Sequence, residues 1–170
     1  MRFSGLDQDI IFGNYTVDSK TLIKTPNCFF EHSSDTEAIV ILGGDFENVE
    51  MKGCTFINAI VSVSVFGGQA MVNTTISDNT FVITSEFTNK YLIRADSTGN
   101  KGNHFNNNKL IYNVSSGAGG YTFIYTNTNV MDYSITSGNV ATELDTSSWL
   151  SNWSDETGST GYTETNNNKS

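Results

Sequence analysis

The chain has 170 residues and a formal net charge of −9, with nine Lys and Arg against 18 Asp and Glu. Nucleic acids are bound mainly through clustered Lys and Arg, so this charge excludes a nucleic-acid partner and disfavours an anionic membrane surface. The length fits one domain that buries its own core. A single proline and an excess of Asn, Thr, Ser and Gly over helix-forming residues favour strands joined by turns.

Targeting and metal-binding signals are absent from the sequence. No run of about 18 apolar residues could span a membrane, and the first residues, MRFSGLDQDI, lack the apolar region of a signal peptide. We therefore expect no membrane insertion and a chain made in the cytoplasm without a signal peptide. Two cysteines, Cys28 and Cys54, are too few for a disulfide framework, and no Cys/His cluster has metal-ligand spacing. We expect no cofactor and no metal.

The N-terminal segment, residues 1–28, contains QDIIFGNYTVDSKTLIK. This stretch is typical of a strand, a Gly-Asn turn and further strands. We expect these strands to lead into the following repeats or to cap them.

Residues 29–142 contain an internal repeat. The segments MKGCTF, ISDNTF, FNNNKL and ITSGNV share one form: an apolar residue, turn residues, a polar residue and an apolar residue, with KTPNCF as a weaker copy. Spacings of 27, 25, 29 and 30 residues separate their closing apolar residues, which are Phe29, Phe56, Phe81, Leu110 and Val140. Alternating runs such as EAIVILGG and AIVSVSVFGG lie between the copies and keep the same phase. The pattern predicts an all-β fold, a right-handed single-stranded parallel β-helix of about five or six coils, stacked at about 4.8 Å.

A column of turn residues precedes each closing residue by two positions. Its members are Asn27, Cys54, Asn79, Asn108 and Gly138. Asn and Gly tolerate the left-handed backbone region, and stacked Asn side chains can hydrogen-bond along such a column. We predict that these residues form the structural turn column of the fold.

The two cysteines lie close to this column on neighbouring coils. Cys28 is one place from it, on the coil before Cys54, so their Cα atoms could lie at disulfide distance. A pair of small buried thiols is the alternative interpretation.

Residues 143–170 are predicted to be a C-terminal cap or oligomerisation segment with a polar tail. Trp149 and Trp153 in ELDTSSWLSNW are four residues apart, which fits one face of a short helix beginning at Asp145 or Thr146. The tryptophans either cover the core or contact another subunit. The final stretch, SDETGSTGYTETNNNKS, is polar and low in complexity, and we expect it to be disordered without a partner.

The pattern of GNYTVDSKTLIK followed by repeated Φ-x-x-N-x-Φ units (Φ, apolar) resembles the pectate-lyase-like β-helix superfamily. Within it, the chain is most similar to the Asn-, Thr- and Gly-rich coils of bacteriophage tailspikes and tail fibres, over Gly13 to Thr142. The resemblance implies a homotrimer that binds or cleaves polysaccharide as part of a virion, the extracellular particle, in contact with other virion proteins. No catalytic motif of the lyases is matched residue by residue. We therefore expect a non-catalytic fibre, spike or decoration protein that mediates assembly or attachment to host surface glycans.

The alternative function is a polysaccharide-degrading tailspike domain, a hydrolase or lyase. Asp45 and Asp96 are weak candidates for its catalytic residues, because they fall in nearly one column two coils apart, roughly 9.6 Å at the stacking distance. That separation is at the edge of the range used by inverting glycosidases. Both also follow strand ends, where Asp is favoured for capping turns.

Aromatic residues are the candidates for glycan binding or subunit contact, because aromatic faces stack on sugar rings and on neighbouring chains. Tyrosines recur in the later coils, including Tyr91 and Tyr133. The residues that we select for a binding or interface role are Tyr112, Tyr121, Tyr125, Trp149 and Trp153. Regular-surface binding through threonine arrays is disfavoured, because Thr126/Thr128 and Thr163/Thr165 do not stack at one phase.

Overall fold

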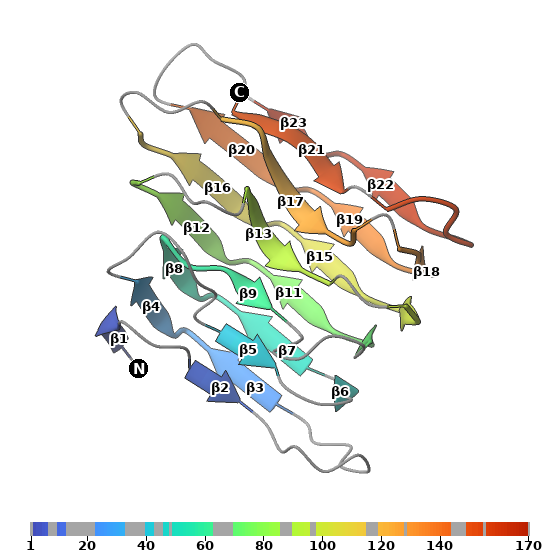
Figure 1. Cartoon of the computed structure of the whole chain (residues 1–170), viewed down its shortest axis with the longest axis horizontal. Coiled ribbons are helices and arrows are strands. Elements are labelled where there is room, and N and C mark those ends of the chain that lie inside the picture. The colour runs from blue at the N-terminus through green and yellow to red at the C-terminus, as the bar shows by residue number, and fades with distance from the viewer. Residues whose placement is uncertain are drawn as a thin grey trace.

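A computed structural model of the chain describes residues 2–6, 10–12, 23–32, 40–42, 46–47, 49–62, 70–85, 90–95, 98–114, 119–127, 129–143, 149–154 and 156–169. These residues form 23 strands arranged in four parallel sheets. They contain no helix, and hence none that could cross a membrane. The strands follow one another in chain order along a β-solenoid, from blue at the N-terminal end to red at the C-terminal end (Figure 1). The predicted all-β, parallel solenoid is confirmed.

Sheets A and C follow each other directly along the chain in most turns. Sheet A contains β1 (Arg2–Leu6), β4 (Phe29–His32), β8 (Thr55–Ile57), β12 (Thr80–Ile83), β16 (Lys109–Tyr112), β20 (Val140–Glu143) and β23 (Asn168–Lys169). Sheet C contains β3 (Ile23–Pro26), β7 (Val49–Lys52), β11 (Thr75–Ser77), β15 (His104–Asn106), β19 (Ile135–Ser137) and β22 (Thr163–Thr165).

Sheets B and D complete the solenoid. Sheet B contains β2 (Ile10–Phe12), β5 (Val40–Leu42), β9 (Val61–Ser62), β13 (Tyr91–Arg94), β17 (Tyr121–Tyr125) and β21 (Leu150–Ser154). Sheet D contains the short strands β6 (Phe46–Glu47), β10 (Met71–Val72), β14 (Asn100–Lys101) and β18 (Met131–Asp132). From β6 to β21 the described strands pass through sheets D, C, A and B in turn, and β22 and β23 add to sheets C and A, so equivalent positions of successive turns become direct neighbours.

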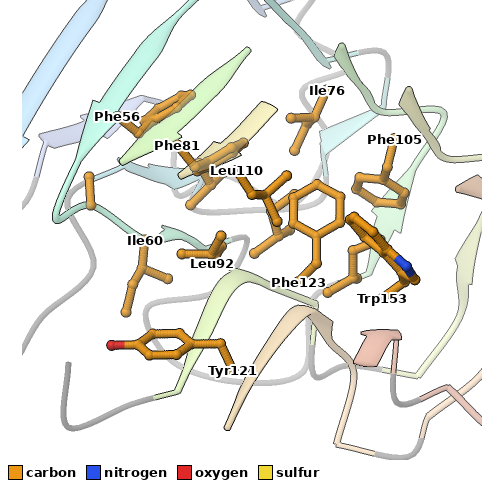
Figure 2. Packing of buried hydrophobic residues seen from close by; sticks show 14 of the residues in the cluster. Phe56, Ile60, Ile76, Phe81, Leu92, Phe105, Leu110, Tyr121, Phe123 and Trp153 are labelled. Carbon is orange, nitrogen blue, oxygen red and sulfur yellow. The ribbon is translucent and has the colours of Figure 1, made fainter. Parts of the chain in front are cut away.

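The core is a set of stacked columns of equivalent residues. Phe30, Phe56 and Phe81 pair in register, with stacked rings whose centroids are 5.1 and 4.8 Å apart. Leu110 and Ala141 continue the column in the later turns. Figure 2 shows Phe56, Phe81 and Leu110 side by side in the interior. Offset aromatic stacking adds about 0.5 to 1.5 kcal/mol per pair to the burial of the rings.

This column corrects the predicted repeat by one residue at both ends. Phe29 is only half-buried and Val140 is 37% exposed, whereas Phe30 and Ala141 point into the core. Side chains of a strand alternate between its two faces, so a shift of one residue exchanges inside for outside. Phe29 and Val140 therefore belong to the outer face of sheet A.

The same shift separates the predicted turn column into two columns. Asn27 and Gly138 lie on the true turn column between sheets C and A, where φ is between 53° and 66°. Its members are Asn27, Gly53, Asp78, Asn107, Gly138 and Asn166. Glycine at position 138 leaves space for the Asn107 side chain of the preceding turn, because a Cβ there would lie 2.5 Å from Asn107 Oδ1.

Cys54, Asn79 and Asn108 occupy the next position, where side chains point inward and form a ladder. We call Cys28, Cys54, Asn79, Asn108, Asn139 and Asn167 the inner column. The grouping of Cys54, Asn79 and Asn108 with Asn27 and Gly138 was wrong. Asn hydrogen bonding between turns, which we predicted, does occur, but on this inner column.

Asn79, Asn108 and Asn139 make hydrogen bonds through both the oxygen and the nitrogen of the amide, as Asn108 illustrates. Its Oδ1 accepts from the backbone N–H and from Nδ2 of Asn79, both at 3.1 Å. Its Nδ2 donates to the Ile76 carbonyl at 2.9 Å and to Asn139 Oδ1 at 3.0 Å. Buried polar groups are tolerated only when they are paired in this way. The ladder therefore fixes both the register and the direction of the stack.

The C-terminal segment continues the sheets, contrary to two predictions. The predicted short helix is wrong over Leu150–Ser154, which is strand β21; Asp145 and Thr146 lie outside the described residues. The polar tail was expected to be disordered, but it forms β22 and β23, which pair with β19 and β20. The prediction was based on low sequence complexity, but the same residue types have structural roles here as in earlier turns. Thr163 and Thr165 lie in strand β22, Asn166 lies on the turn column, and Asn167 lies on the inner column.

Two further contacts hold this last turn in place. Lys169 Nζ donates to the Leu150 and Ser151 carbonyls at 2.8 and 2.9 Å. The Tyr162 hydroxyl donates to Thr136 Oγ1 at 3.0 Å, and burial raises the pKa of Tyr162 to about 12. The last turn is therefore packed onto the solenoid.

Replacement of Asn108 by alanine tests the ladder. The change leaves the Asn79 N–H, the Ile76 carbonyl and Asn139 Oδ1 short of a partner inside the core, so we expect the free energy of unfolding to fall by about 3 kcal/mol. Chemical denaturation followed by circular dichroism measures the loss. Asn113→Ala is the matched control, because this asparagine is exposed, and its effect should stay within about 0.5 kcal/mol. Equal effects of the two substitutions would contradict a stabilising ladder.

Candidate functional site on the outer face of sheet B

The outer faces of the three main sheets differ in chemistry. On sheet C, ion pairs connect successive turns, with Lys24 Nζ 3.7 Å from Glu50 Oε2. A second pair reaches from sheet C to the adjacent turn column, with Lys52 Nζ 3.3 Å from Asp78 Oδ2. These side chains are exposed, so each pair contributes at most about 1 kcal/mol. This face is a solvated polar surface.

The outer face of sheet A carries mainly β-branched side chains. Ile57, Val82 and Ile111 form one half-buried column in register, and Thr55 and Thr80 follow Phe29 in a second column beside it. Lys109 and Val140 continue the second column and are exposed. The result is a flat face with little charge between β8 and β20.

The outer face of sheet B carries a tyrosine pair. Tyr91 on β13 and Tyr125 on β17 are both half-buried, and their rings stack with centroids 4.8 Å apart and an interplanar angle of 10°. The Tyr125 hydroxyl donates to Asn127 Oδ1 at 3.1 Å. We call Tyr91, Arg94, Thr122, Tyr125 and Asn127 the tyrosine patch; Thr122 pairs with Tyr91 and Arg94 pairs with Tyr125.

The strands that carry the tyrosine patch are held on both sides. Ile93 and Ile124 are opposite each other on β13 and β17, and both are fully buried. Both strands are internal to sheet B, with β9 and β21 on their outer sides. The backbone under the tyrosines is therefore fixed by hydrogen bonds on both edges. The patch combines aromatic rings with the Tyr125 hydroxyl and the Asn127 amide, groups that suit a polyhydroxylated ligand.

Four of the five aromatic residues selected from the sequence are in the core. Tyr112 stacks on Trp149 at 5.2 Å, and Tyr121 meets Trp149 edge-on at 5.8 Å. Trp153 packs edge-on against Phe123, and Figure 2 shows these two rings together in the interior. The exposed fraction of these four side chains is 7% or less. They therefore cannot provide a binding surface or a subunit seam in the folded chain, and only Tyr125 lies at the surface.

The predicted catalytic pair remains a prediction. Asp45 and Asp96 both lie outside the described residues. Within the described part of the chain, no group of three or more His, Cys, Asp and Glu side chains could hold a metal ion.

Tyr133 is a surface feature that the sequence repeat did not single out. It lies between β18 and β19 with a φ of 51°, and its exposed fraction of 65% is the largest among the large hydrophobic side chains described. Equivalent turn positions hold Asn73, Gly102 and Gly161, which accept a left-handed backbone more readily. Tyr133 lies over Gly161, where a Cβ would be 2.9 Å from the ring. Alignment of this turn across the repeats would have identified the position.

Comparisons with known proteins identify no relative: no family model, no curated protein and no solved structure matches the chain.

The backbone cost of Tyr133 can be tested by Tyr133→Asn. Asparagine adopts the left-handed region more easily and stands at the equivalent position 73, so we expect the free energy of unfolding to rise by about 1 kcal/mol. Urea denaturation of both proteins gives the difference. Tyr133→Val should destabilise the fold, since a β-branched residue is poorly accommodated at positive φ. A destabilising effect of Tyr133→Asn would mean that the ring packing on Gly161 outweighs the backbone cost.

Proposed function

We propose that this chain is a non-catalytic structural and attachment module that binds a glycan through the tyrosine patch. The observation that carries the proposal is the half-buried, stacked pair of Tyr91 and Tyr125 on the neighbouring strands β13 and β17 of sheet B. Aromatic rings present large apolar faces at low cost in side-chain entropy, and their hydroxyls add hydrogen bonds.

The scaffold supports this function because it holds the patch in one geometry. Binding loses less entropy when the site is ordered before the ligand arrives. The internal strands β13 and β17 order both tyrosines, and the Tyr125–Asn127 hydrogen bond orients one hydroxyl. A rod of stacked turns also suits a mechanical role, since each turn is bonded to the next through backbone and inner-column asparagines.

The wider setting that we propose is a bacteriophage fibre, spike or decoration protein. Its support is the resemblance of the Asn-, Thr- and Gly-rich repeats to tailspike coils, together with the parallel solenoid fold. In this proposal the solenoid is a right-handed β-helix of about five or six coils, the default hand for parallel crossovers. The protein acts in the virion, as a homotrimer, next to other virion proteins.

Substitution of the two tyrosines tests glycan binding. We expect Tyr91→Ala and Tyr125→Ala each to weaken binding to a glycan by about 3- to 10-fold, because each removes an aromatic contact of about 0.5 to 1.5 kcal/mol. A glycan array on the wild-type chain identifies the ligand, and isothermal titration calorimetry measures the variants.

Tyr133→Ala is the matched control, because it removes an exposed tyrosine outside sheet B and should leave affinity unchanged. No signal on arrays of bacterial surface glycans at high protein concentration would contradict the proposal. Equal weakening by Tyr133→Ala would also contradict it.

The proposed trimer can be tested on the outer face of sheet A. Burial of Trp149 and Trp153 in the core leaves this β-branched face, with Ile57, Val82 and Ile111 along it, as our candidate for the subunit contact. We expect Ile111→Lys to convert a trimer to a monomer, since a charge buried without a partner costs several kcal/mol.

Multi-angle light scattering gives the mass of each variant. Thr163→Lys is the control, because Thr163 is exposed on sheet C and the variant should remain trimeric. A wild-type monomer at all concentrations tested would contradict the trimer, and a trimeric Ile111→Lys variant would contradict this seam.

A further inference from the structure

Cys28 and Cys54 occupy equivalent positions on adjacent turns. They are neighbours in the inner column because β4 and β8 pair in register, with Phe29 opposite Thr55. Backbone hydrogen bonds between the two turns lie on both sides of the cysteines. The Asn27 N–H donates to the Lys52 carbonyl at 2.9 Å. The Thr55 N–H donates to the Cys28 carbonyl at 2.8 Å. Adjacent strands lie about 4.8 Å apart, inside the Cα separation of about 4.4 to 6.8 Å that a disulfide requires.

The two thiols also point in the same direction. Cys28 Sγ is 3.6 Å from the Pro26 carbonyl oxygen, and Cys54 Sγ is 3.7 Å from the Lys52 carbonyl oxygen, two residues earlier in each case. Both side chains therefore leave the backbone in one orientation on adjacent turns. Both cysteines are in the free thiol form.

These cysteines replace the amide bridge that joins the later turns. From Asn79 onward, each asparagine Oδ1 accepts the backbone N–H of the preceding rung; Asn79 itself accepts from the Cys54 N–H at 2.8 Å. A thiol cannot bridge turns as a primary amide does, because it offers one weak donor and one weak acceptor. The first link of the inner column thus has two sulfur atoms where the other links have amide bridges.

We propose that Cys28 and Cys54 form a reversible disulfide between turns, which makes this link redox-sensitive. The oxidant is a low-molecular-weight disulfide. The half-buried Cys28 thiolate attacks one of its sulfur atoms and expels the first small thiolate, giving a mixed disulfide. The Cys54 thiolate then attacks Cys28 Sγ and expels the second. Two protons and two electrons leave the pair, and the small disulfide is reduced to two thiols.

The consequence is a covalent connection between β4 and β8. The disulfide closes a loop of about 25 residues, which stabilises the fold mainly by restricting the unfolded chain. For a chain of this size we expect Tm to rise by about 5 to 10 °C on oxidation and to return on reduction.

The test uses the full chain, incubated with glutathione disulfide under native conditions. We expect loss of both free thiols, an intact mass lower by two hydrogen atoms, and a disulfide-linked pair of tryptic peptides that contain Cys28 and Cys54. Differential scanning calorimetry before and after oxidation should show the rise in Tm, and dithiothreitol should reverse it.

Two variants keep the outcome interpretable. Cys54→Ser should stop at a glutathione adduct on Cys28 with no rise in Tm. Cys54→Asn restores the amide of the later rungs, so it should be more stable than Cys54→Ser and insensitive to oxidation beyond that adduct. A glutathione adduct as the final product of the wild-type chain would overturn the proposal. So would a disulfide between two chains, thiols that do not react, or a disulfide that forms only in denaturant.

Discussion

In-register pairing of parallel strands is the constraint on which the other features of this molecule depend. Each residue has its own equivalent from the preceding and following turns as its nearest neighbours. A column must therefore consist of residues that pack well on themselves, as the phenylalanines at 30, 56 and 81 do. Charged columns need alternating signs for the same reason, and Lys24 lies beside Glu50 on sheet C.

The inner column shows how a polar group can order a core. A buried primary amide is costly unless all its hydrogen bonds are made. The preceding turn gives Asn79, Asn108 and Asn139 a backbone N–H donor and a carbonyl acceptor. The following turn gives each of them the amide oxygen of the next asparagine as a second acceptor. A slip of register by one residue would break every rung at once, so the ladder specifies the fold as well as stabilising it. Cys28 and Cys54 lie at the first two positions of the inner column, where no asparagine amide joins the two turns. Our proposed disulfide would join the turns at this place.

The core columns repeat similar residues from turn to turn, whereas the side chains on the outer faces differ from sheet to sheet. Only these outer side chains can distinguish one face for function. Sheet C presents ion pairs, sheet A presents β-branched side chains, and sheet B presents the stacked Tyr91 and Tyr125. These faces share one scaffold, so the proposed attachment through sheet B and the proposed subunit contact through sheet A are compatible. Tyr133 adds an exposed ring on a backbone conformation that favours asparagine or glycine. Function here depends on which side chains the columns place outward.

The sequence alone determined the all-β, parallel, repeating architecture, because in a solenoid the repeat period and the alternation of apolar residues along each strand are visible in the order of the residues. It also identified asparagine as a residue that bonds between turns, and it included Tyr125 among the surface candidates.

Tertiary structure decided which side chains point inward and which contacts they make. The closing residues were misplaced at Phe29 and Val140, since apolar residues stand on both faces at those positions and only pairing with Phe56 or Leu110 shows which one is inside. Trp149 and Trp153 looked equally suited to a seam or a core, and their burial depends on contacts with Tyr112 and Phe123 from earlier turns. Partners so distant in sequence are set by stacking, and no local pattern of residues contains them.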